Sequence, residues 1–404
     1  TVTATITDGS GNVSPASAPA TITIDTVGPT APATAPSVAE NAGGGINGTE
    51  AVDGTTVDVP LTGTGASEGD VVNVIIDGVA TPHTITAGEI ASGIASVAIP
   101  ASVLTSAGQG PATVTATITD GSGNVSPASA SATITIDTIA PTTSAYTLVD
   151  TGTSASDGIT KNATVGVTIE SGATWEYSVN AGSAWTAGSG NSFTLAEGVH
   201  ATGDIKVRQT DAAGNLQTIG IATNAAPITI DTGSPIFSSG TSATAVSGVA
   251  TSAVIYHAQA TDNNGPNDPN ITYTLTGADA SKFTINVAGE VKFVASPTHA
   301  TPTDVGANNV YDINVVATDV AGNAATQAVA ITVNNAASVV TPDSATHTYV
   351  ENAVGIAVNS GITITDIDST TLTGATVTIS NGLTAGDTLS FTPANGCLLY
   401  TSPS

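Results

Sequence analysis

The stretch "TVTATITDGSGN" at residues 113–124 places an alternating segment directly before a turn motif. Threonines alternate with Val114, Ala116 and Ile118, so one face of this segment is apolar and the other is polar. Such alternation is typical of a β-strand that is buried on one face only. Asp120 and the glycines after it favour a tight turn. We therefore predict a strand that ends in a turn at residues 120–124.

This stretch belongs to a repeat, because residues 1–30 recur at residues 113–142. The two copies differ only at Pro19/Ser131, Val27/Ile139 and Gly28/Ala140. Shorter copies of the D-x-x-G-N motif occur at residues 211–215 and 319–323. A second apolar segment follows each motif and ends at Asp25, Asp137, Asp231 and Asn334 in turn, so the last copy has Asn instead of Asp. Repetition of this kind indicates tandem modules.

Strands are also predicted at residues 55–62, 71–76 and 94–99, with turn signals between them. Thr, Val, Ile, Ser and Gly dominate the composition, and helical stretches are not expected. The fold class is therefore all-β, with tandem antiparallel β-sandwich modules of about seven strands in an elongated array. The predicted modules are a first, partial one at 1–26, a second at 27–139, a third at 140–232, a fourth at 233–335 and a fifth, partial one at 336–396.

The last eight residues, 397–404, differ abruptly in composition and contain the one cysteine of the chain, Cys397. They resemble the translated end of a sequencing adaptor, so we treat them as a non-native tail and leave them out of the fold.

The chain has 32 Asp and Glu residues against five Lys and Arg residues, for a net charge of −27. This charge excludes nucleic acid and anionic lipid as partners and favours cations. No apolar run approaches the ~20 residues of a membrane span, so we expect no membrane insertion. The five histidines show no metal-site spacing, and no nucleophile motif is present, so we do not expect an enzyme.

The combination of Ile-Thr-Ile-Asp-Thr, a Pro-bearing joint and D-x-x-G-N resembles the bacterial immunoglobulin-like repeats of large secreted adhesins of the RTX, type I-secreted kind. Residues 233–335 resemble a bacterial cadherin-like repeat instead, through Ala260-Thr-Asp262, Ile271–Leu275 and Ala317-Thr-Asp319. Residues 336–396 resemble the start of another cadherin-like repeat. The resemblance implies an extracellular protein of the bacterial cell surface.

Strand parity brings aspartates together at the module joints. If seven antiparallel strands alternate in direction, the residues after strand 6 face the preceding module, and the residues after strand 7 face the next one. We therefore expect Asp25 to meet Asp120, and Asp137 to meet Asp211. Asp231 is expected to meet Asp319, with Asp262 at the same pole.

Carboxylates gathered at a joint repel one another unless a cation lies between them, and oxygen ligands from several loops suit Ca²⁺. Cadherins bind calcium at such joints, and Glu40 and Glu351 resemble the acidic residue that cadherins place after the first strand. The resemblance adds Glu40 to Asp137. The alternative for each aspartate is turn chemistry alone.

The joint between the fourth and fifth modules differs from the others. Asp366 and Asp368 lie on its fifth-module side, but the fourth module offers only Ser247, Thr298, Ala300 and Asn334, where related repeats carry acidic residues. We expect this joint to bind calcium weakly or not at all.

These observations predict a stalk segment of a bacterial surface adhesin or biofilm protein, stiffened by calcium and by contacts between neighbouring modules. Two alternatives stay open. The modules bind a glycan or protein of a host or neighbouring cell, in which case an exposed Trp185 would form a stacking platform. In the second alternative, they are ancillary repeats of a large extracellular enzyme.

Deletion of residues 397–404 should leave the thermal unfolding midpoint unchanged, because this segment does not share the composition of the modules. Calorimetry of the full and shortened chains measures this. A fall of several degrees would show that the tail belongs to the fold.

Overall fold

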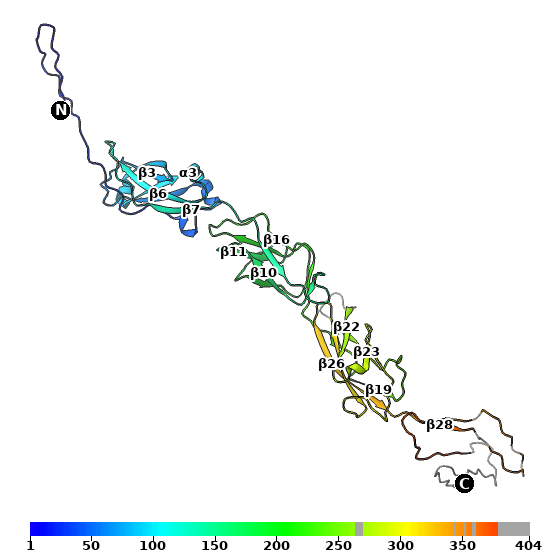
Figure 1. Ribbon diagram of the computed structural model, residues 1–404. Helices are drawn as coiled ribbons and strands as arrows, with labels where there is room; N and C mark the ends of the chain where they lie inside the picture. The colour runs from blue at the N-terminus through cyan, green and yellow to red at the C-terminus, as the bar shows by residue number, and fades with distance from the viewer. Residues whose placement is uncertain (263–269, 343, 349, 351–352, 358–360, 379–404) are drawn as a thin grey trace. The chain divides into compact units, whose positions relative to one another are not determined.

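The computed structural model describes residues 1–262, 270–342, 344–348, 350, 353–357 and 361–378. The chain forms two compact units, of which the first is Thr1–Gly233 with Val320–Gly322, and the second is Ser234–Asp319 with the residues from Asn323 on. Both units are built almost entirely from β-strands, as the sequence predicts (Figure 1).

The second module contributes the strands β1 (Ser37–Val38), β2 (Thr55–Pro60), β3 (Val71–Ile76), β4 (Val79–Thr84), β5 (Ile94–Ile99), β6 (Gly110–Thr119) and β7 (Ala132–Ile136). They form two antiparallel sheets, in the orders β1-β2-β5 and β4-β3-β6-β7. Val114, Ala116 and Ile118 of β6 are fully buried between the sheets. The strands predicted at 55–62, 71–76, 94–99 and 113–119 are thus confirmed.

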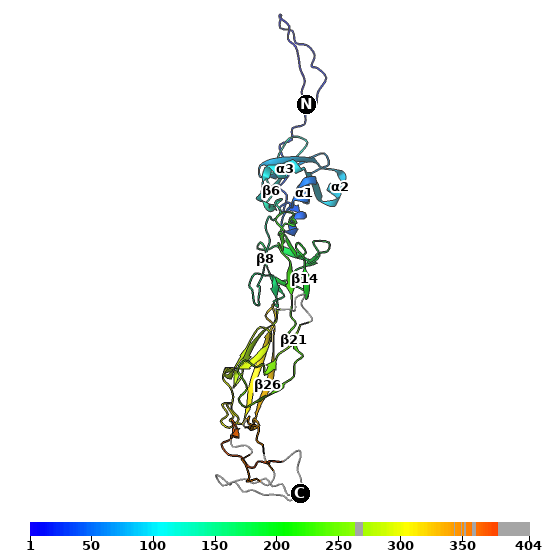
Figure 2. The ribbon, with the colours of Figure 1, turned by 90° about the vertical axis from the view of Figure 1, so that its right-hand side faces the viewer.

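Three short helices lie in the connections of the second module, where no helix was expected (Figure 2). They are α1 (Gly48–Asp53), α2 (Ala87–Ser92) and α3 (Ala101–Ala107). In α1, Asn47 accepts from the Glu50 N–H, and Glu50 accepts from the Asn47 N–H, which forms a capping box. Thr86 and Glu89 form the same box at α2. The expectation of no helix was wrong here, because helices of six or seven residues are too short to show helical periodicity.

The third module has ten strands in three small sheets, in the orders β13-β10-β8, β12-β11-β15-β16 and β14-β17-β9. Their bounds are β8 (Ala145–Leu148), β9 (Ile159–Thr160), β10 (Thr164–Thr168), β11 (Thr174–Ser178), β12 (Thr186–Ala187), β13 (Ser192–Thr194), β14 (Gly198–His200), β15 (Lys206–Thr210), β16 (Ala222–Thr223) and β17 (Ile228–Ile230). Val165, Trp175 and Phe193 are among the residues of its core.

The second unit contains β18 (Ile236–Phe237), β19 (Ser242–Val246), β20 (Tyr256–His257), β21 (Ala260–Thr261), β22 (Thr272–Thr276), β23 (Phe283–Ile285), β24 (Glu290–Phe293), β25 (Val310–Thr318), β26 (Ala324–Asn334), β27 (Val339–Thr341) and β28 (Thr363–Thr365). Sheets β19-β26-β25-β22 and β20-β24-β23 enclose a core around Phe283, Phe293 and Tyr311. The rings of both phenylalanines meet Tyr311 edge to face. Within the described part of the chain, strands β27 and β28 pair only with each other.

One pairing recurs in the second, third and fourth modules and decides which residues meet at the end of each. An early segment runs parallel to the last strand: Ile46 bridges Ile136, β9 pairs with β17, and β19 pairs with β26. Parallel segments point the same way, so the residues after both lie at the pole of the module where its last strand ends. We call this end the C-terminal pole.

Residues 1–26 contain isolated bridges, Val2 with Ala20 and Thr7 with Val13, but no strand (Figure 1). Ile6 is 77% exposed, whereas Ile118, at the same place in the repeat, is 0% exposed. Burial of this isoleucine therefore depends on the facing sheet and not on the local sequence.

Ile118→Ala should lower the free energy of unfolding of the second module by about 2–5 kcal/mol, because it leaves a cavity in a packed core. The control is Ile6→Ala, which has the same neighbours in sequence but an exposed side chain and should change stability by less than about 0.5 kcal/mol. Denaturant unfolding measures both. A similar loss in the two variants would contradict the assignment of the core.

Candidate functional site

The D-x-x-G-N loops share one set of internal hydrogen bonds. In each loop the Asn side-chain amide donates to the Asp Oδ2 atom, at 2.9 Å for Asp8, Asp120 and Asp211 and 3.0 Å for Asp319. The backbone N–H of the same Asn donates to the Asp Oδ1 atom. The glycine before the Asn has φ between 87° and 100° in all four, a conformation that favours glycine. The predicted turn chemistry is therefore present in every copy.

In two of these loops the hydrogen bonds also favour the ionised form of the carboxylate. The side-chain hydrogen bond from Asn124, followed by those from backbone N–H groups, lowers the pKa of Asp120 below its ordinary value. Asp8 shows the same lowering of its pKa for the same reason, with Asn12 as the donor. Turn chemistry and a negative charge at the joint are therefore compatible.

Asp25 and the Asp120 loop come together, as strand parity predicts. The Asn124 Nδ2 atom donates to the Asp25 carbonyl oxygen at 3.3 Å, and the Ser122 hydroxyl donates to the Asp25 carboxylate at 3.4 Å. The contact at this joint thus passes through Ser122 and Asn124, while Asp120 shapes the loop that carries them.

The joint between the second and third modules has closer contacts. Asn215 donates from Nδ2 to the Asp137 carbonyl oxygen at 2.8 Å, and its Oδ1 atom accepts from the Gly48 N–H at 2.7 Å. The capping box at Asn47 positions Gly48 at the first residue of α1. The third-module loop therefore binds both segments of the preceding C-terminal pole.

Gly44 permits this close approach. Its φ is 106°, and a Cβ atom added there would lie 2.1 Å from the carbonyl oxygen of Ala212. Any larger residue at position 44 would separate the two modules at this point.

Asn124 and Asn215 are joint residues that the sequence analysis missed. The available signal was the Asn at the fifth position of every D-x-x-G-N motif. We attributed that position to the turn, and the structure gives it a second partner in the neighbouring module.

Glu40 lies in the 3₁₀ helix Glu40–Gly43, and its carboxylate accepts a hydrogen bond from the Thr55 hydroxyl. The role of Glu40 beside Asp137 stays a prediction. Asp150 occupies the matching place after the first strand of the third module and was not predicted. Its Oδ2 atom accepts from the Gly158 N–H at 2.9 Å, and its Oδ1 atom is buried without a hydrogen-bond donor in the described part of the chain.

The second unit brings together Asp262, which follows β21, and Asp319, which follows β25. Both are buried, at 6% and 5% exposure, and carboxylate oxygens of the two lie within 4.8 Å of each other. Asp231 follows β17, where its backbone N–H donates to the Thr160 carbonyl oxygen at 3.0 Å. Asp262 thus lies beside Asp319 within the second unit, and the meeting of Asp231 with Asp319 stays a prediction.

Asp366 and Asp368 follow β28 and lie at the C-terminal pole of the fourth module. Asp368 accepts a hydrogen bond from the Ser247 hydroxyl, and Asp366 accepts one from the Ser338 hydroxyl at 2.6 Å. Glu351 lies outside the described residues.

The aromatic platform proposed for glycan binding is covered. Trp185 is half-buried, and the guanidinium carbon of Arg208 lies 3.9 Å from its ring centroid. Arg208 also forms an ion pair of 2.8 Å with Glu176. The guanidinium therefore occupies a ring face on which a sugar would stack.

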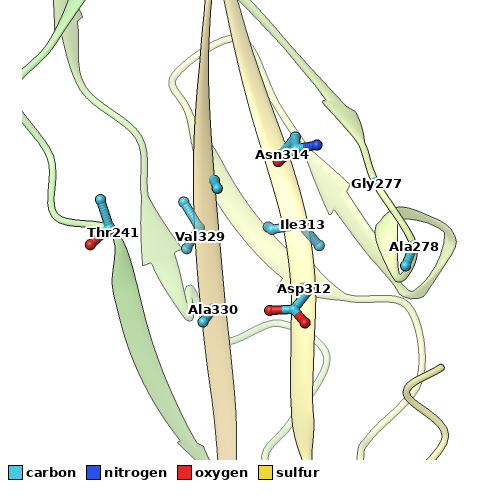
Figure 3. Close-up of a pocket in the computed structure, with 9 residues that line it drawn as sticks. Thr241, Gly277, Ala278, Asp312, Ile313, Asn314, Val329 and Ala330 are labelled. Carbon is cyan, nitrogen blue, oxygen red and sulfur yellow. The ribbon is translucent and has the colours of Figure 1, made fainter. Parts of the chain in front are cut away.

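A shallow pocket of about 300 Å³ lies on the outer face of β25 and β26 (Figure 3). Asp312 and Asn314 are its most polar lining residues, and the others are Thr241, Gly277, Ala278, Ile313, Ala328, Val329 and Ala330. This lining has no aromatic ring and a single carboxylate. No helix among the described residues combines the length and apolar character that crossing a membrane requires.

No protein-family model matches this chain, and no curated protein matches it. Similar solved structures include part of a 1.5-MDa bacterial ice-binding adhesin, with 19% identity over 76% of this chain and 99% of that one and a TM-score of 0.33. A Ca²⁺-stabilized adhesin with which an Antarctic bacterium binds ice has 21% identity over 82% and 81%, and a TM-score of 0.31. Drosophila N-cadherin EC1–4 has 15% identity over 67% and 68%, and a TM-score of 0.23. Adhesin domains and cadherin repeats are thus among the structural neighbours.

Asn215→Ala should loosen the joint between the second and third modules by about 1–3 kcal/mol, because it removes two intermodule hydrogen bonds. Hydrogen exchange at the Gly48 amide should become faster. Asn12→Ala removes the same side-chain hydrogen bond to the loop aspartate in the first module and serves as the control. Unchanged exchange at Gly48 in the Asn215 variant would show that the Asn215 hydrogen bonds do not hold this joint.

Proposed function

We propose that this chain is a structural segment of a bacterial surface adhesin and that Ca²⁺ stiffens it at the module joints. The observation that carries the proposal is the buried pair of Asp262 and Asp319, whose carboxylate oxygens lie within 4.8 Å. Two buried carboxylates at this spacing repel each other, and a cation between them removes that cost.

The donor chemistry fits calcium. Ca²⁺ takes six to eight oxygen ligands from carboxylates, carbonyls and water, in flexible geometry. The chain has 32 acidic residues and only five Lys and Arg residues, so its own side chains supply few positive charges. Asp262 and Asp319 would hold the ion, and the bound ion would supply fixed positive charge.

Asp231 is the ligand that would link this pair to the preceding module. Ile236 pairs with Thr261, the neighbour of Asp262. Ile236 lies five positions after Asp231, and an extended chain of that length spans at most about 18 Å. We propose Asp231 as a third ligand of this ion.

At the two joints before this one, Asp25 with Asp120 and Asp137 with Asp211 are the proposed carboxylates, with Glu40 beside Asp137. Hydrogen bonds from Asn124 and Asn215 already hold the motif loops against Asp25 and Asp137. A bound ion would neutralise the negative charge of the carboxylates at each joint. A joint that is cross-linked by the ion would bend less. Extracellular modules typically bind calcium with dissociation constants of about 10⁻⁴ to 10⁻³ M, which suits a secreted protein.

Calcium should raise the thermal midpoint of the chain, since each site at tenfold its dissociation constant adds about 1.4 kcal/mol. Native mass spectrometry at millimolar calcium should show fewer bound ions after Asp262→Asn and after Asp137→Ala. Asn334→Ala should leave the number unchanged, because Asn334 lies at the joint that lacks carboxylates on the fourth-module side.

Equal losses from Asp262→Asn and Asn334→Ala would falsify this assignment of ligands. If the unmodified chain binds no calcium, the calcium proposal is wrong, and these aspartates serve only to form the turns.

A further inference from the structure

The carboxylate of Asp368 lies among hydrogen-bond donors of the fourth module. The Ser247 hydroxyl donates to its Oδ1 atom, and the His299 N–H donates to the same atom at 3.1 Å. The Ala336 N–H donates to its Oδ2 atom at 2.7 Å, and the Ala300 N–H donates to the carboxylate as well. Both oxygens of Asp368 are thus bound by protein donors.

These donors come from three separate segments of one pole. Ser247 follows β19, and its N–H donates to the Asn334 carbonyl oxygen at 2.9 Å at the end of β26. Its hydroxyl also accepts from the His299 N–H at 3.0 Å, which ties the loop at 299–300 to the same place. The parallel pairing of β19 with β26 therefore builds the pole on which Asp368 rests.

The chemistry of this pole selects an anion. N–H and O–H groups direct hydrogens at Asp368, and hydrogens cannot ligate a cation. A carboxylate that accepts several such bonds is a strongly bound partner, because hydrogen bonds to a charged acceptor are about twice as strong as neutral ones.

A turn at Asp366 and the packing of Ile367 on Gly248 hold the fifth-module loop in position. Asp366 Oδ1 accepts from the N–H groups of Asp368, at 2.8 Å, and Ser369, at 2.9 Å. Ile367 packs onto Gly248, where a Cβ atom would lie 2.6 Å from the Ile367 Cδ1 atom and φ is 75°. Gly248 therefore gives Ile367 room, and Asp366 fixes the turn that presents Asp368.

We propose that Asp368 closes the joint between the fourth and fifth modules by occupying a carboxylate-binding site on the fourth module, so that this joint needs no divalent cation. The proposal is independent of calcium binding at the other joints. Removal of divalent cations should leave this joint closed, whatever it does to the earlier ones.

The charge of Asp368 is maintained in this site. Burial alone would raise the pKa of Asp368, but the hydrogen bonds from Ala336, Ser247, His299 and Ala300 outweigh burial and lower it. The carboxylate is therefore ionised at neutral pH, as the donors require.

Hydrogen exchange of the full chain, followed by mass spectrometry, tests this directly. In the unmodified chain, exchange at the His299 and Ala336 amides should be the same with and without EDTA, within about twofold. Asp368→Asn should speed exchange at both amides by about tenfold or more, since it replaces a charged acceptor. Asp312→Asn, which removes an exposed carboxylate of the fourth module, is the matched control and should leave both rates unchanged.

Exchange at Val291, in the core of the fourth module, reports whether each variant is folded. If Asp368→Asn unfolds the module, Ser247→Ala replaces it, with a smaller increase expected at His299. EDTA that speeds exchange at His299 and Ala336 in the unmodified chain would overturn the proposal, and so would unchanged rates in Asp368→Asn. Failure of the calcium proposal appears elsewhere, as an absence of any EDTA effect at Gly48.

Discussion

The hydrogen bond from Asn to Asp within the D-x-x-G-N loop is the contact on which the joints at Asp25 and Asp137 depend. At Asp211 it fixes the Asn215 side chain, whose remaining polar atoms then reach Asp137 and Gly48. Without this bond the asparagine side chain would be free to rotate. Its hydrogen bonds to the neighbouring module would then cost side-chain entropy each time they formed. The hydrogen bonds of the motif aspartate therefore shape its own loop, and the asparagine of that loop makes the hydrogen bonds to the neighbouring module.

A second constraint is the parallel pairing of an early segment with the last strand, which gives the second, third and fourth modules the same kind of C-terminal pole. The side chains placed there differ. Around Asp137 the pole presents the Asp137 carbonyl oxygen and the Gly48 N–H to Asn215, whereas around Ser247 it presents donors to Asp368. One geometry thus supports two chemistries: the incoming Asn215 both donates and accepts, and the incoming Asp368 only accepts.

Much of the fold could be predicted, because a strand's two-residue period is visible in as few as five residues. Val114, Ala116 and Ile118 alternate with threonine, and all three lie in the core. The short helices were missed because one and a half turns show no period, although Asn47 with Glu50 was a capping signal. The partner of Asp368 was also beyond sequence reasoning, since Ser247 is far away in the chain and carries no charge to mark it.

The repeat itself separates local from tertiary causes, because residues 1–30 and 113–142 are nearly identical. Both copies form the same turn, at Asp8 and at Asp120, since every donor and acceptor of the turn lies within five residues. Only the second copy buries the isoleucines that both copies share, because β2 and β5 supply a facing sheet there. The sequence by itself determined the turns and the strand periodicity, which are local. The tertiary structure decided burial and the partners at each joint, because those require groups that are distant in the chain.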